Sequence, residues 1–80
     1  MYSTALQHYP QRVSQREQQV LELLSNGLSS TEIASKLYLS FHTVNDHRRA
    51  LKDKLGAKNA AQMIRKGFEL QLLQLPTFSS

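Results

Sequence analysis

Residues 29–56 read SSTEIASKLYLSFHTVNDHRRALKDKLG and contain the signals of two helices separated by a tight break. Ser29 followed by Glu32 is a capping box, in which each side chain bonds a free amide at the start of a helix. The break falls at residues 38–40, and Ser40 can cap the longer helix that follows. A short helix, a break of about three residues and a longer basic helix predict a helix-turn-helix.

Two further helices flank this stretch. Ser14 opens another capping box, ahead of a helix that ends near Gly27. Asn59 can cap a last helix, which must end by Leu75 because Pro76 follows. Strand-like alternation and hairpin turns are absent from the sequence. The sequence therefore predicts an all-α fold of four helices, over about 15–26, 30–37, 41–55 and 60–75.

The length of 80 residues allows one small domain. We expect residues 1–12 to form a tail or linker stub, residues 13–75 the domain, and residues 76–80 a second tail. The absence of cysteine excludes disulfides, thiolate metal sites and a cysteine nucleophile. No leader peptide or membrane-spanning run is seen, so we expect a cytoplasmic protein without a membrane partner.

The positive charge is concentrated in one part of the chain. Residues 36–66 hold eight Lys and Arg against two Asp, whereas the whole chain has a net charge of +4. A basic balance in so small a domain indicates a polyanionic partner, with nucleic acid as the first candidate. A solvated charged face is the alternative interpretation.

The third predicted helix has an apolar face and a polar face. Val44, Leu51 and Leu55 point in nearly the same direction at about 100° per residue, so we expect them in the core. Arg and Asn side chains can bond two atoms of a guanine or adenine edge in the major groove. The opposite face collects His42, Asn45, Asp46, Arg49, Lys52 and Asp53.

The stretch from about Val13 to Phe68 resembles the LuxR-type (GerE-like) DNA-binding domain of bacterial transcription regulators. The resemblance implies a winged-helix-like fold without a wing, whose third helix enters the major groove and whose fourth helix often pairs two copies. In this family the domain usually follows a receiver or ligand-binding domain. The matching elements are Arg16-Glu17, Val20-Leu21, Gly27, Glu32-Ile33-Ala34, Leu37, Ser40, Thr43-Val44, His47 and Lys54-Leu55-Gly56.

The resemblance and the polar face together give a set of expected DNA contacts. The expected partner is double-stranded promoter DNA with an inverted-repeat site, and RNA polymerase is a further candidate partner. Asn45 stands where such domains frequently have Lys, and Asp46 is acidic where phosphate is near, so the target sequence is not predicted. The expected DNA-contacting residues are Ser40, His42, Thr43, Asn45, Asp46, Arg48, Arg49, Lys52, Lys54 and Lys58.

The fourth predicted helix has more apolar residues than a small core can cover. One stripe is expected to pack onto the domain, and it comprises Ala60, Ala61, Ile64, Phe68, Leu72 and Leu75. Met63 and Leu70 lie on a neighbouring face, with Leu73 further round. Exposed apolar residues on a terminal helix indicate a partner, here a homodimer through Met63 and Leu70. The alternative interpretation is a frayed apolar tail.

The sequence argues against an enzyme. His42 and His47 are five residues apart and cannot share a metal on one helix, and no glycine-rich phosphate loop or nucleophile elbow is present. We therefore expect no metal and no cofactor. Two alternatives remain open, a promoter-reading domain like that of a sigma factor and a protein-interaction module that has lost DNA binding. The acidic residue Asp46 is the feature that keeps the second alternative open.

Overall fold

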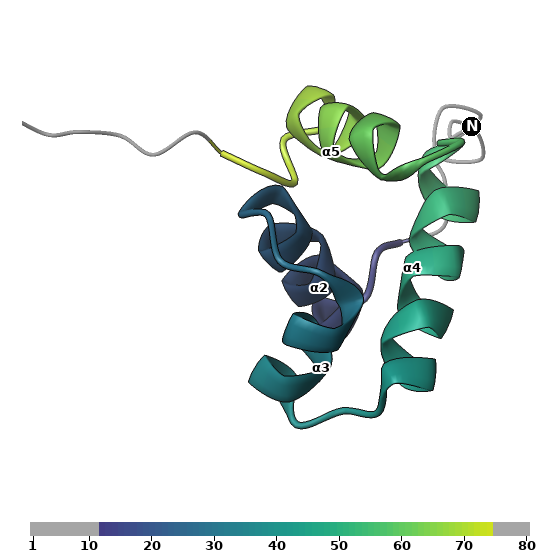
Figure 1. Ribbon diagram of the computed structural model, residues 1–80. Coiled ribbons are helices and arrows are strands. Elements are labelled where there is room, and N and C mark those ends of the chain that lie inside the picture. The colour runs from purple at the N-terminus through teal and green to yellow at the C-terminus, as the bar shows by residue number, and fades with distance from the viewer. Residues whose placement is uncertain (1–11, 75–80) are drawn as a thin grey trace, which may run out of the picture.

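The computed structural model describes residues 12–74. Within these residues the chain forms four helices and no strand (Figure 1). This confirms the predicted all-α fold. The tails predicted at residues 1–12 and 76–80 lie outside the described residues, except for Arg12. The helices are α2 (Gln15–Ser25), α3 (Ser30–Leu37), α4 (Phe41–Leu55) and α5 (Ala60–Glu69).

The helices begin at the predicted caps. The Ser14 hydroxyl accepts a hydrogen bond from the Glu17 amide, and the Ser14 amide donates to Glu17 Oε1 at 2.9 Å. Ser29 and Glu32 repeat this arrangement at the start of α3. Because each box satisfies amides that lack a partner within the helix, these local sequences define where α2 and α3 start.

The connections between helices need left-handed backbone at three positions. Gly27 and Gly56 have φ values of 91° and 65°, as predicted for the ends of α2 and α4. Tyr38 also has a positive φ, 58°, in the turn between α3 and α4. This conformation is unusual for a residue with a Cβ atom, and the sequence pattern did not predict it.

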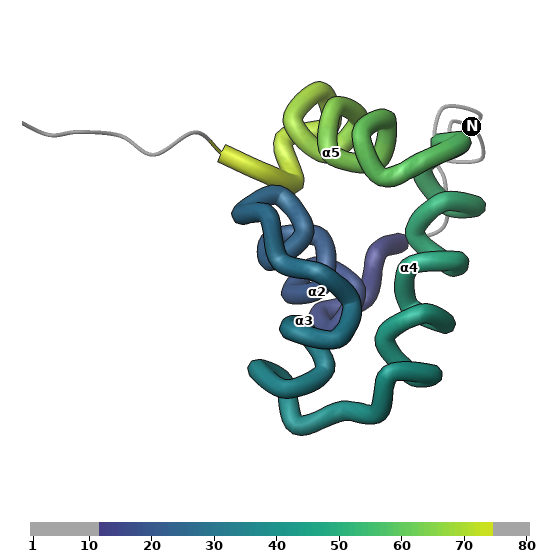
Figure 2. Tube along the Cα trace, viewed as in Figure 1, coloured from purple at the N-terminus to yellow at the C-terminus, as the bar shows by residue number. Residues whose placement is uncertain are grey.

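The core lies where the helices meet. α4 runs along one side of the molecule, α2 and α3 face it, and α5 crosses the end where α4 finishes (Figures 1 and 2). Apolar burial is the main stabilising contribution in such a small domain. The buried apolar residues are Val20, Leu21, Leu24, Ile33, Ala34, Val44, Leu51, Leu55, Ala57, Met63 and Leu73.

The packing of α5 corrects the prediction for the fourth helix. Met63 is fully buried, so it cannot form the predicted exposed dimer face, whereas Leu70 is 43% exposed. Ala61 and Phe68, predicted to pack inward, are both exposed. The predicted stripe left out Met63 and Gly67, which are the buried residues of α5.

The early end of α5 explains this error. The helix stops at Glu69, well before the predicted limit at Leu75, because Gln71 adopts a positive φ of 63°. The Leu72 and Leu73 amides both donate to the Gly67 carbonyl, and Leu73 folds back into the core. Leu73 fits there because Gly67 has no side chain. The predicted core position Leu75 lies outside the described residues.

Candidate nucleic-acid interface

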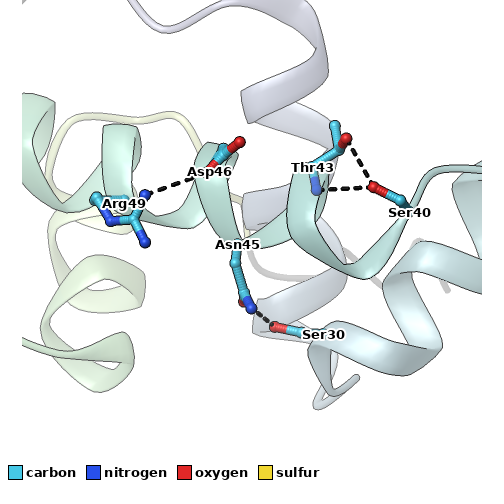
Figure 3. Close-up of polar contacts among 6 residues, drawn as sticks. All are labelled: Ser30, Ser40, Thr43, Asn45, Asp46 and Arg49. Atoms are coloured by element: carbon cyan, nitrogen blue, oxygen red, sulfur yellow. Dashed lines mark hydrogen bonds and ion pairs between the residues drawn. The ribbon is translucent and has the colours of Figure 1, made fainter.

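The start of α4 is open to an anion. Ser40 caps the helix by accepting from the Thr43 amide at 3.0 Å, and its hydroxyl donates to Thr43 Oγ1 at 2.9 Å (Figure 3). At the equivalent position α2 and α3 carry Glu17 and Glu32, but α4 has no acidic residue in its first turn. A helix N-terminus without a carboxylate can accept a phosphate, because its free amides and dipole favour negative charge.

The polar face of α4 projects away from the core, as predicted. His42, Asp46 and Arg49 are exposed, while Val44 on the opposite face is fully buried. Arg49 Nη1 lies 3.1 Å from Asp46 Oδ1, so the two side chains form an ion pair along the surface of the helix (Figure 3). These residues occupy the first three turns of α4, next to the α3–α4 turn.

Asn45 and Arg48 are held by the neighbouring helix. The buried Ser30 hydroxyl of α3 donates to Asn45 Oδ1 at 3.1 Å and accepts from Arg48 Nη1 at 2.6 Å. This chain of hydrogen bonds joins the first turn of α3 to the middle of α4 and helps to fix the angle between the two helices. The bond to Ser30 uses the Asn45 oxygen, so its amide nitrogen keeps two hydrogens to donate. The Asn45 oxygen also keeps one lone pair, so the side chain can still donate to and accept from a base edge.

The basic residues do not all face the same way. Lys52 follows Arg49 along α4 and is half-buried, and Lys58 is exposed in the α4–α5 connection. Lys54, in contrast, reaches inward: its Nζ atom donates to Glu17 Oε1 at 2.7 Å and to the Arg12 carbonyl at 3.1 Å. Its charge is therefore already paired within the domain, which disfavours the DNA contact expected of Lys54.

The Glu17 carboxylate is specialised for this internal pair. Burial raises its pKa, but the hydrogen bond from Lys54, the Ser14 amide and the positive charge of Lys54 outweigh that effect and hold the pKa below the ordinary value. The side chains of Glu17 and Lys54 are only 8% and 17% exposed. The pair thus connects α2 to the C-terminal part of α4.

Two aromatic residues beside the polar face were not among the predicted site residues. Tyr38 in the α3–α4 turn is 95% exposed, and Phe41 at the first position of α4 is 50% exposed. Their places in the break and off the Val44 stripe were the signal that could have identified them. An exposed aromatic ring near the major groove can contact a thymine methyl group.

Comparison with known proteins identifies the family. The sequence-family model for bacterial regulatory proteins of the luxR family matches residues 11–66. The chain belongs to the luxR family. This membership confirms the resemblance found in the sequence and makes the helix-turn-helix of α3 and α4 the DNA-binding, transcription-regulating element of a luxR-type domain. It also rules against the sigma-factor alternative.

Several curated regulators are similar to this luxR-type domain. The methanol utilization control regulatory protein MoxX of Paracoccus denitrificans is 39% identical over 56 residues, which cover 70% of this chain and 25% of that protein. The transcriptional regulatory protein UhpA of Escherichia coli (strain K12) is 42% identical over 57 residues, or 71% of this chain and 29% of that protein. The chain thus spans between a quarter and a third of these relatives.

A solved structure has the same fold. The response regulator ChrA, from a heme-sensing two-component system, aligns with a TM-score of 0.76 and 35% sequence identity over 79% of this chain and 31% of that chain. Among residues 12–74 of the luxR-type domain, no cluster of three acidic, histidine or cysteine side chains could hold a metal ion. Within the same residues, no helix has the length and apolar character needed to cross a membrane.

Proposed function

We propose that this luxR-type domain places the N-terminal half of α4 in the major groove of double-stranded DNA and reads base edges there. The observation that carries the proposal is the one-sided helix: Val44 and Leu51 are fully buried, while His42, Asp46 and Arg49 on the other face are exposed. A helix used in this way contacts bases mainly through its first turns.

In this proposal, different groups of the domain contact the phosphates and the bases. The amides at the start of α4, with the Ser40 and Thr43 hydroxyls, suit one phosphate. Lys52 and Lys58 suit two more, since neither has the internal partner that Lys54 has. Arg49 and Asn45 supply the base contacts, and Arg48 anchors α4 to α3. His42 lies at the edge of the same face and is a further candidate contact.

Binding to duplexes at several salt concentrations tests the proposal. Neutralising about three phosphates per protomer gives a log–log slope of affinity against salt near −3. A preference for one sequence should remain at each salt concentration, because base contacts release few counterions. If no duplex binds even at low salt, the domain is instead an interaction module that has lost DNA binding.

The domain is further proposed to bind as a homodimer through α5. Ala61, Arg65 and Phe68 recur every three to four residues and are exposed, so they form an unpartnered stripe, with the exposed Leu70 beyond the helix end. A two-fold pair would place two copies of α4 roughly 34–36 Å apart on an inverted-repeat site. One helix-turn-helix alone covers too few base pairs to select a single site in a genome.

The regulatory context is inferred from the relatives. ChrA is described as a response regulator, and UhpA as a transcriptional regulatory protein. We infer that this domain supplies the DNA-binding output of a response-regulator type of protein and acts on promoter DNA in the bacterial cytoplasm. Contact with RNA polymerase would make the effect an activation, and a reconstituted transcription assay would distinguish this from repression.

A further inference from the structure

The ion pair between Asp46 and Arg49 lies on the face of α4 that is proposed to meet DNA. The side chains are 71% and 72% exposed, and the pair spans one helical turn at 3.1 Å (Figure 3). An exposed pair of this kind contributes little to folding stability, because water and salt screen it. Its position at the centre of the proposed interface calls for a role other than stability.

The pair favours one orientation of the Arg49 side chain before DNA is present. A guanidinium group has five N–H donors, and the hydrogen bond to Asp46 uses one of them. The remaining donors still suffice for a bidentate contact with O6 and N7 of guanine. A side chain that is already oriented loses less conformational freedom when it binds. Asp46 can therefore raise the preference of Arg49 for guanine without touching that base.

The pair also changes what Asp46 can do in the groove. Arg49 Nη1 occupies Oδ1, and the second carboxylate oxygen can accept another hydrogen bond. On the major-groove edge only cytosine N4 and adenine N6 offer an amino donor, whereas guanine O6 and thymine O4 would repel a carboxylate. The positive charge of Arg49 reduces the repulsion between Asp46 and the DNA phosphates.

We infer that Asp46 and Arg49 act as one base-reading unit. Arg49 contacts a guanine, while Asp46 positions Arg49 and accepts a hydrogen bond from a cytosine or adenine amino group in the same or the adjoining base pair. Asp46 is then a positioning and specificity-determining residue, although its charge alone opposes DNA binding. This inference rests on the proposed function, in which α4 enters the major groove.

The test combines a protein change with a base change. Selection of bound duplexes from a random pool gives the preferred site, which should contain a guanine whose replacement lowers the affinity of the unaltered chain but not of Arg49→Ala. The candidate amino-bearing bases are the cytosine paired with that guanine and any cytosine or adenine in the adjoining base pairs, and one of them should be required for full affinity. That base is then replaced by an analogue without the amino group, 2-pyrimidinone for cytosine or unsubstituted purine for adenine. The unaltered chain should lose roughly tenfold in affinity. Asp46→Ala should lose less than about twofold from the same replacement, since the accepting oxygen is already gone.

Asp53→Ala is the matched control, because Asp53 is another exposed acid on α4 without the ion pair to Arg49. This variant should keep the tenfold loss. If Asp46→Ala and the unaltered chain lose the same affinity when the amino group is removed, Asp46 and Arg49 do not act as one base-reading unit. DNA binding by α4 would still stand. If the unaltered chain binds no duplex at low salt, the proposed function fails together with this inference.

Discussion

Lys54 Nζ lies 2.7 Å from Glu17 Oε1 and joins the last turn of α4 to the first turn of α2. Glu17 also completes the capping box with Ser14, so one carboxylate starts a helix and fixes a second helix against it. The orientation of α4 relative to the core therefore depends on this pair near its end and on the hydrogen bonds to Ser30 near its beginning. Asp46 and Arg49 lie between these two points along α4.

Substitution of Lys54 should affect the stability of the fold, whereas substitution of Lys52 should affect DNA binding. Lys54→Ala leaves the Glu17 carboxylate buried without its partner, and should reduce the free energy of unfolding by roughly 2–4 kcal/mol. Lys52→Ala should change stability little but make the salt slope of DNA binding less negative by about one. Urea unfolding and salt titrations of both variants measure this. A stable Lys54→Ala with a reduced salt slope would show that Lys54 contacts phosphate instead.

The pKa of Glu17 gives stability a dependence on acid pH. Because this pKa is lower in the folded chain than its ordinary value, the contribution is fully present above about pH 4.5 and is lost as the pH falls through the folded pKa. Glu17→Gln should lower stability at neutral pH and reduce the difference in stability between about pH 7 and pH 3. Urea midpoints at the two pH values measure the effect. An equally large difference in Glu17→Gln and in the unaltered chain would contradict this account.

Gly67 and Leu73 should be coupled in stability. A Cβ atom at Gly67 would lie 2.7 Å from Leu73 Cδ1 and 3.1 Å from Leu21 Cδ2, so Gly67→Ala must shift the Leu73 side chain from its place in the core. We expect a net loss of about 1 kcal/mol, even though alanine favours a helix over glycine by about the same amount. In a Leu73→Ala background the same change should become neutral or stabilising. Additive losses in the double variant, measured by urea unfolding, would contradict this packing.

The exposed stripe of α5 should support cooperative binding without supporting the fold. Ala61→Asp combined with Phe68→Gln should leave helix content and half-site affinity largely unchanged but abolish cooperative occupancy of an inverted repeat. Met63→Asp should unfold the domain, because it buries an unpaired charge. Circular dichroism and gel-shift titrations separate these outcomes. Gln15→Asp, an exposed change of equal charge on α2, is the control; cooperativity that survives the double change would place the dimer contact elsewhere.

The helices and most of the core followed from local sequence signals. Ser14, Ser29 and Ser40 mark helix starts through hydrogen bonds made within one turn. The spacing of Val44 and Leu51 alone identifies the buried face of α4. The burial of Met63 and the internal pairing of Lys54 were not predicted, because both depend on distant segments. Leu73 covers α5 only after the chain reverses at Gln71, and Glu17 pairs with Lys54 across 37 residues of sequence.

The central claim is that α4 reads base edges through Arg49. The most direct measurement is the affinity of Arg49→Ala for the selected operator and for an unrelated duplex of equal length at the same salt concentration. We predict a loss of about 1–3 kcal/mol on the operator, with a relaxed preference at one base pair and a much smaller change on the unrelated duplex. Equal losses on both duplexes would contradict the claim, because they would make Arg49 a phosphate contact that carries no sequence information.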